Sequence, residues 1–155
     1  MPPDSDPVAP WRALLLAQNA VLRAIDEDLD RAGAVPLVVY DVLLELNAAP
    51  ERRLRMKELA ARTVLTRSRV SKLVDELVDQ GLVERRADPS DRRGSVVAIA
   101  PAGRRALKKG APVYLDGIAR HFTAHLTPAE AATVTAALER VLEAHQPLIQ
   151  RRSSR

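Results

Sequence analysis

The sequence predicts a mainly α fold with a small antiparallel β wing, a winged helix-turn-helix with dimerisation helices at its N- and C-terminal ends. Three observations predict this class. Apolar residues recur at helical spacing over most of the 155 residues. Two short helical segments joined by a short connection lie within residues 56–80. Directly after them, residues 84–95 form a charged turn between two short apolar runs, which indicates a β-hairpin.

Two helices are expected before this core. The first occupies residues 8–32, where Trp11 and a series of Leu, Val and Ile residues recur at helical spacing, and it ends at Gly33. The second begins at Pro36 and continues to about Ala48, because Pro50 cannot extend it.

The helix-turn-helix follows from two segments. Residues 56–63 have apolar side chains placed to pack on a neighbour, and the connection Val64-Leu65 is short. The second helix is predicted over residues 66–80, with Thr66 as a suitable N-cap and Gly81 where a helix stops. Its first half is basic and its second half acidic, so we expect it to approach DNA by its beginning.

The wing is predicted from the runs Leu82-Val83 and residues 96–99. Residues 88–91, Asp-Pro-Ser-Asp, supply turn chemistry, and Gly94 is expected to form a left-handed corner before the return strand. The hairpin tip then presents Arg92 and Arg93. A third strand is expected at Leu54 and Arg55.

After the wing, a helix is expected from Pro101 to about His125, broken or kinked near residues 110–112 by Gly110-Ala111-Pro112. The last helix begins with Thr127-Pro128-Ala129-Glu130, a capping box with proline at the first helical position. The outer helices have more apolar surface than the small core can cover, which favours a homodimer joined through both termini. The expected domains are a disordered tail at residues 1–8, dimerisation helices at 9–35 and 112–147, a winged helix-turn-helix at 36–111, and a disordered basic tail at 148–155.

The net charge of +4 is unevenly distributed. Residues 51–72 contain eight basic and two acidic side chains, and residues 84–105 contain six and three, whereas residues 1–50 contain three and eight. Positive charge therefore peaks at the helix-turn-helix and at the wing, the footprint of a surface that binds double-stranded DNA. Composition alone is equally consistent with solvated surface arginine, and the predicted wing geometry favours DNA.

From residue 54 to 107 the chain resembles the MarR (multiple antibiotic resistance regulator) family of bacterial winged-helix transcription factors. The most specific elements are Gly-Leu-Val-Glu-Arg-Arg-Ala-Asp-Pro-Ser-Asp-Arg-Arg-Gly at residues 81–94 and Ile-Ala-Pro-Ala-Gly-Arg-Arg-Ala-Leu at 99–107. The resemblance implies that Arg93 reaches the minor groove and that Asp91 helps to orient it. Ala100 departs from the family, which usually has threonine or serine there, so the next helix lacks the expected N-cap.

The expected function is a sequence-specific DNA-binding transcriptional regulator, a homodimer that binds an inverted repeat through paired recognition helices and wings. The resemblance implies a repressor released by a small-molecule effector. Plain surface serine is the alternative for Ser68 and Ser71, and a turn residue bonded to its own backbone is the alternative for Asp91. A winged-helix module for protein contacts, without sequence-specific DNA binding, is the alternative function. The expected DNA-binding residues are Arg67, Ser68, Arg69, Ser71, Lys72, Asp91, Arg92 and Arg93.

Other sites receive weaker support. His121 and His125 lie four residues apart and His145 is a third possible zinc ligand, but no carboxylate or thiolate partner is evident, and an exposed or interfacial pair is favoured. Tyr40 and Tyr114 are more consistent with core packing than with an effector pocket.

Several classes of protein are disfavoured. The chain has no cysteine, no glycine-rich phosphate loop and no Gly-x-Ser-x-Gly motif, so we expect neither an enzyme nor a cofactor. No apolar run approaches the roughly 18 residues of a membrane span, and a cytoplasmic location is expected.

Overall fold

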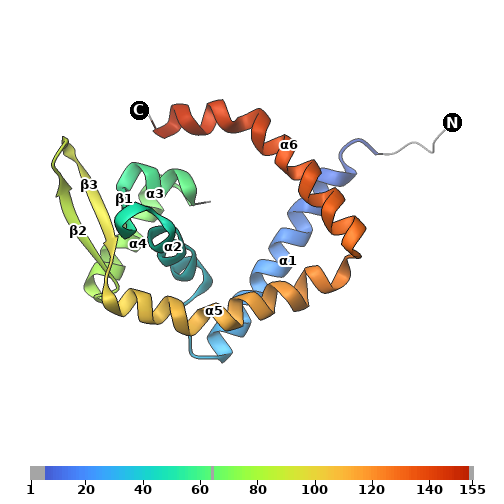
Figure 1. The fold of residues 1–155 in the computed structure, drawn as a ribbon, viewed down its shortest axis with the longest axis horizontal. Helices are drawn as coiled ribbons and strands as arrows, with labels where there is room; N and C mark the ends of the chain where they lie inside the picture. The colour runs from blue at the N-terminus through green and yellow to red at the C-terminus, as the bar shows by residue number, and fades with distance from the viewer. Residues whose placement is uncertain (1–5, 64, 154–155) are drawn as a thin grey trace.

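A computed structural model describes residues 6–63 and 65–153, and its architecture confirms the predicted fold class. The described residues form a mainly helical chain with one three-stranded antiparallel sheet (Figure 1). The elements are α1 (Ala9–Arg31), α2 (Leu37–Ala48), the 3-10 helix η1 (Pro50–Arg52), β1 (Arg53–Arg55), α3 (Met56–Arg62), α4 (Arg67–Asp79), β2 (Val83–Asp88), β3 (Asp91–Ile99), α5 (Pro101–His121), the 3-10 helix η2 (Thr123–His125) and α6 (Pro128–Ser153).

The core lies around α2. Leu43 and Leu46 of this helix are fully buried and share one apolar cluster with Leu59 of α3, Leu77 of α4 and Val97 of β3. Full burial of each such side chain contributes about 1.5–3 kcal/mol relative to exposure. The two helices of the helix-turn-helix and the wing are therefore held on one common core.

The sheet has the order β1-β3-β2, with β3 in the middle. Leu54 of β1 lies opposite Val97 of β3, and both side chains are buried, so the short third strand is fixed by its one inward residue. The third strand predicted at Leu54 and Arg55 is present. The hairpin of β2 and β3 extends away from the helices (Figure 1).

Of the break or kink predicted near Pro112, the break is absent, because α5 continues without interruption through this residue. Proline removes the hydrogen bond to the carbonyl of Lys108, but both residues are exposed, so water can satisfy that carbonyl. Packing also holds the helix on both sides of the proline. A Cβ on Gly110 would lie 3.0 Å from the ring of Tyr40, and a Cβ on Gly117 would lie 3.0 Å from Ile25, so glycine permits close contact with α2 and α1. The domain boundary expected at residues 111 and 112 thus falls inside one continuous helix.

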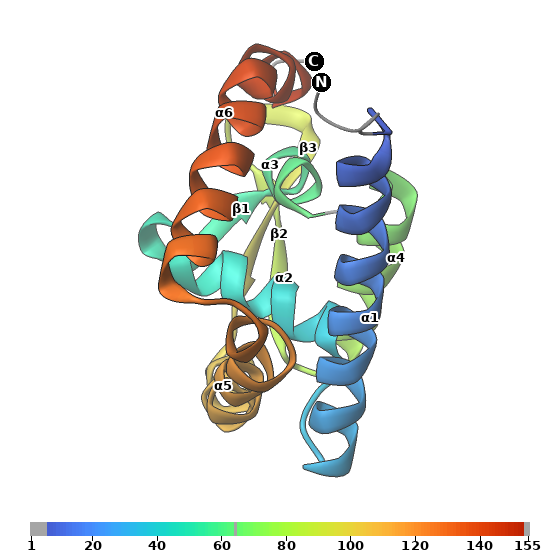
Figure 2. The same cartoon turned by 90° about the vertical axis from the view of Figure 1, so that its right-hand side faces the viewer.

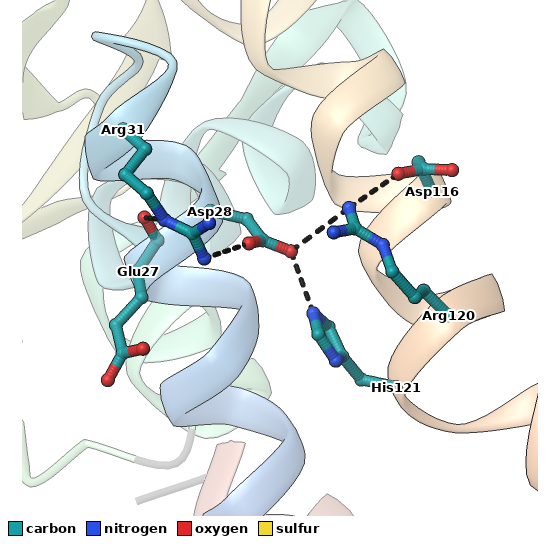
Figure 3. Close-up of polar contacts among 6 residues, drawn as sticks. All are labelled: Glu27, Asp28, Arg31, Asp116, Arg120 and His121. Carbon is teal, nitrogen blue, oxygen red and sulfur yellow. Dashed lines mark hydrogen bonds and ion pairs between the residues drawn. The ribbon is translucent and has the colours of Figure 1, made fainter.

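A polar cluster joins α1 to α5 (Figure 3). The buried carboxylate of Asp28 accepts a hydrogen bond from Arg31 at 2.5 Å and lies 2.7 Å from His121 Nε2 and 3.3 Å from Arg120. Arg120 also pairs with Asp116 at 2.6 Å. The pKa of Asp28 is lowered, first by its hydrogen bond to His121 and then by the charges of the two arginines, against the opposing effect of burial.

The outer helices are exposed over much of their length. The first half of α1 has no buried residue, and Trp11 is 61% exposed; Leu142 of α6 is 59% exposed. Figure 2 shows α1 and α6 on opposite sides of the view, with α5 at the base. The capping box of α6 is confirmed, because the Thr127 N–H donates to Glu130 Oε2 at 2.8 Å and the Glu130 N–H donates to Thr127 Oγ1 at 3.3 Å.

The structure describes part of each of the two predicted disordered tails. Residues 1–5 of the tail expected at 1–8 lie outside the described residues, and residues 7–8 form a turn that leads into α1. At the other end α6 continues to Ser153, so residues 148–153 are helical where disorder was expected, and residues 154–155 lie outside the description. The sequence predicted that this helix ends near residue 147. It continues through Pro147, and no proline or glycine follows that would stop it.

Candidate nucleic-acid interface

Helix α4 has one buried and one exposed face. Val70, Val74 and Leu77 are fully buried, and Thr66 caps the helix because its Oγ1 accepts the Arg69 N–H at 3.4 Å. Val78 is 37% exposed at the edge of the apolar stripe that these residues form. Burial of one face turns the opposite face outward. Of the residues predicted to bind DNA from this helix, Ser71 is half-buried and the exposed ones are Arg67, Ser68, Arg69 and Lys72.

The acidic half of α4 is bound to the wing. Asp75 accepts a hydrogen bond from Arg85 of β2 at 2.6 Å, and Arg85 Nε donates to Ser95 of β3 at 3.0 Å. The sequence predicted only that this helix approaches DNA by its basic beginning, and it did not indicate a role for Arg85. The pairing connects this helix to the hairpin.

The hairpin is longer than predicted; its turn lies within residues 88–91 as predicted, but Arg92 and Arg93 follow the tip instead of occupying it. Its strands run to Asp88 and from Asp91, so the turn itself is Pro89-Ser90. The sequence did not predict the charged part of β2 as a strand, because both faces of β2 are largely exposed near the tip and such a strand needs no alternation of apolar residues.

The return strand has a bulge next to this turn. Ala87 pairs with Ser95 and Asp88 pairs with Asp91, so the three residues Arg92, Arg93 and Gly94 have no register partner in β2. The left-handed corner predicted at Gly94 is wrong, because among the described glycines only Gly33 and Gly81 have positive φ. Gly94 instead allows a close approach: an added Cβ would lie 3.2 Å from the Asp91 side chain.

Two aspartates shape the tip. Asp88 Oδ1 accepts the Ser90 N–H at 2.9 Å and the Ser90 hydroxyl at 2.8 Å, and these hydrogen bonds, helped by the charge of Arg55, lower the pKa of Asp88 against the effect of burial. Asp91 Oδ1 accepts the Arg93 N–H at 3.0 Å. The turn-residue alternative for Asp91 is therefore present, and through it Asp91 contacts the backbone of the arginine that it was expected to orient.

Unpaired positive charge is present on both the first half of α4 and the bulge of β3. Other arginines of this region are engaged: Arg85 with Asp75, Arg86 with Glu84 at 2.7 Å, and Arg55 with Asp88 at 2.9 Å. In contrast, five exposed cations on the first half of α4 and on the bulge of β3 form no ion pair with any side chain in residues 6–63 and 65–145. These five are Arg67, Arg69, Lys72, Arg92 and Arg93.

The other candidate residues lie away from these two elements. His121 is hydrogen-bonded to Asp28 and the His145 ring to the Val141 carbonyl at 2.8 Å, and the described residues contain no group of three or more metal-ligating side chains. Tyr40 and Tyr114 pack against each other with ring centroids 4.6 Å apart, and burial raises the pKa of both hydroxyls. In the part of the chain that the structure describes, no helix is both long and apolar enough to cross a membrane.

Comparison with known proteins connects this geometry to one family. The sequence model of the MarR family matches residues 35–94. The structure is similar to that of Sco3205, a MarR family transcriptional regulator from Streptomyces coelicolor solved in complex with DNA, with 34% identity, a TM-score of 0.79, and coverage of 88% of this chain and 86% of that one. AbsC, a MarR family transcriptional regulator from the same organism, is 28% identical with a TM-score of 0.79, over 89% of this chain and 93% of that one.

A more distant structure shares the fold. BpsR of Bordetella bronchiseptica, whose DNA binding is regulated by 6-hydroxynicotinic acid, is 19% identical with a TM-score of 0.74, and the match covers 84% of this chain and 96% of that one. A search of curated protein sequences gives no match.

Proposed function

Since this chain belongs to the MarR family of DNA-binding transcriptional regulators, we propose that it acts as a homodimer that binds an inverted repeat in double-stranded DNA. The α4 helix of each subunit enters a major groove, and each wing holds the flanking minor groove. In this proposal Ser68, Arg69, Ser71 and Lys72 face base edges or adjacent phosphates, and Arg67 contacts the DNA backbone. Arg92 and Arg93 act from the wing, with Asp91 shaping the bulge that presents them.

The observation that supports this proposal is that the helix start and the wing bulge both carry exposed, unpaired cations. A phosphate backbone attracts arginine and lysine side chains that no carboxylate already neutralises. The helix start and the wing bulge supply such side chains, while Arg85 and Arg86 beside them are paired within the protein. The two elements are linked by the Arg85 and Asp75 pair, so they can bind one duplex as a unit.

The exposed apolar surface of the outer helices supports the homodimer. Contiguous exposed apolar side chains on a soluble chain usually mark an interaction surface. At α1 these are the N-cap residue Val8 and the helix residues Trp11, Leu14, Leu15 and Leu16, each at least 38% exposed, and in α6 they are Val141 and Leu142. A second copy would cover them, and its α4 helix would lie about one DNA turn, roughly 34 Å, from the first.

Repression relieved by a small molecule is the regulatory part of the proposal. The structural relative BpsR shows that this fold can respond to an aromatic acid. In this chain an effector would act by binding better to one separation of the two α4 helices than to the other. We assign no residue to its site. We assign no catalytic residue either, and propose a binding protein in place of an enzyme.

The wing provides the most direct test. Replacement of Arg93 by Ala should weaken binding to the operator and reduce the slope of log K against log salt by about 0.9, the effect of one lost phosphate contact. Replacement of Arg86 by Ala is the matched control, because Arg86 lies on the same hairpin and is paired with Glu84. The two should be compared by titration of labelled duplex from the region upstream of the gene. An unchanged slope for Arg93→Ala would contradict the role of the wing.

A protein-interaction module is the second candidate function. It predicts equal, weak binding to promoter-proximal and unrelated duplexes at every salt concentration. The five unpaired cations favour DNA, because a protein-binding wing does not require basic side chains on both elements. A specificity ratio of at least about 1,000 at physiological salt would support the regulator.

A further inference from the structure

The wing tip is bonded to the start of the helix-turn-helix by one side chain. We propose that Arg55 is a positioning residue that sets where the wing meets DNA, although it does not itself contact the DNA. This inference rests on the proposed function of the wing. It concerns a residue that was expected only to contribute a short third strand.

The guanidinium of Arg55 bonds to both side chains of the turn. Its Nε lies 2.9 Å from Asp88 Oδ2, and its terminal nitrogen donates to Ser90 Oγ at 2.8 Å. The side chain of Asp88 is 4% exposed, and its other oxygen accepts the two hydrogen bonds from Ser90. The three residues thus form a closed network in which each carboxylate oxygen has a partner. A planar guanidinium can serve two acceptors in this way, whereas an ammonium presents a single point of charge.

The backbone of Arg55 is itself held in place. Arg55 is the last residue of β1, pairs in register with Val96 of β3, and donates its N–H to Glu58 Oε2 at 2.9 Å. Glu58 belongs to the first turn of α3. The side chain therefore connects a fixed point at the beginning of the helix-turn-helix to a turn 35 residues later in the sequence.

The position of this link explains its importance. The bulge of Arg92, Arg93 and Gly94 begins two residues after Ser90 and has no partner in β2. The strand ladder therefore does not fix the bulge, and a two-stranded hairpin is flexible by itself. The bond from Arg55 to Asp88 and Ser90 supplies a second attachment close to the two arginines. Without that bond, Arg92 and Arg93 are still present in the chain, but the wing tip is no longer held in the position that places them at the minor groove.

The first measurement uses the free protein. Hydrogen exchange followed by mass spectrometry should show faster exchange of the wing amides in residues 88–94 for Arg55→Gln than for wild type, by about tenfold for the loss of one charge-assisted contact. Arg53→Gln is the matched control. It removes the same charge from the same strand, but Arg53 pairs with Glu51 and not with the wing. Equal exchange in wild type and Arg55→Gln would overturn the proposal.

The second measurement separates positioning from direct phosphate contact. Arg55→Lys keeps the charge but not the two-pronged geometry, and Asp88→Asn keeps the acceptor for Ser90 but loses the ionic partner of Arg55. Both should weaken operator binding and remove wing protection in hydroxyl-radical footprints. The double variant Arg55→Gln with Asp88→Asn should be no weaker than Arg55→Gln alone. Wild-type affinity and footprints for Arg55→Lys and Asp88→Asn, with a loss only in Arg55→Gln, would show a direct phosphate contact and overturn the proposal.

Two controls make the outcome decisive. Thermal unfolding of Arg55→Gln and Arg55→Lys should match wild type within a few degrees, because Arg55 is 44% exposed and the change is confined to the wing. If the wild-type protein binds no duplex specifically, the proposed function fails. In that case the exchange measurement still determines whether Arg55 holds the wing.

Discussion

Replacement of Gly103 by Ala tests how the wing is attached to the rest of the molecule. Gly103 lies in the first turn of α5, where a Cβ would come within 2.1 Å of the Leu82 carbonyl oxygen. That oxygen cannot move freely, because it accepts the Ala100 N–H at 3.0 Å. The start of α5 is therefore packed directly against the backbone that leads into β2.

The magnitude follows from this geometry. A carbon rarely approaches a carbonyl oxygen closer than about 3.3 Å, so the two backbones must separate by about 1.2 Å. Overpacking of this kind costs about 1–3 kcal/mol, and a backbone obstacle places the cost at the upper end. The greater helix propensity of alanine offsets at most about 1 kcal/mol. We expect the free energy of unfolding to fall by roughly 2 kcal/mol and the melting temperature by about 4–8 °C.

Urea and thermal unfolding at one protein concentration provide the assay, since the stability of a dimer depends on concentration. Gly117→Ala is the matched control: it makes the same change in the same helix, but its Cβ would meet the buried side chain of Ile25 at 3.0 Å, so that side chain has to give by only a few tenths of an ångström. Its stability should stay within about 1 kcal/mol of wild type. If Gly103→Ala is as stable as Gly117→Ala, the clash with the backbone is not as the structure describes it.

Three further predictions concern the core, the α1–α5 contact and the dimer. Leu77→Ala should lower the free energy of unfolding by about 2–5 kcal/mol in urea titrations, because the side chain is fully buried, whereas Val78→Ala at the exposed edge should cost less than about 1 kcal/mol. Because the pKa of Asp28 is lower in the folded than in the unfolded protein, where it is about 3.9, Asp28 stabilises the fold at pH values above about 3.9, and this contribution is lost as pH falls through the folded pKa. Asp28→Asn should remove that part of the pH dependence of the free energy of unfolding. Identical pH profiles for the variant and wild type would contradict this role of Asp28. Trp11→Glu should raise the dimer dissociation constant in sedimentation equilibrium, with Arg23→Gln on α1, which changes the charge by the same one unit, as the control; an unchanged dimer would exclude α1 from the interface.

Local signals predicted most of the secondary structure. The stripe of Val70, Val74 and Leu77 located the recognition helix, and the capping box at Thr127 and Glu130 located the start of α6, because both depend on residues close in sequence. A break or a kink was predicted at Pro112, and the break did not occur. Packing on both sides of the proline outweighed its local cost, and a single sequence does not reveal such packing.

The proposed DNA-binding residues show the same division. Sequence indicated the basic start of α4 and the arginines of the wing, since type and spacing identify them. It could not show which arginines were already neutralised. Arg85 is paired with Asp75 and Arg55 with Asp88, and neither pair has a recognisable spacing in the chain.

The sequence by itself determined the fold class, the order of the elements and the family resemblance, because helical periodicity, caps and turn residues act over a few positions. Only the tertiary structure decided which charges remain unpaired, how the bulge at Arg92 and Arg93 is formed, and what holds the wing tip in place. Ion pairs and strand register join residues that are distant in the chain. Their energies depend on distances that exist only after the chain has folded.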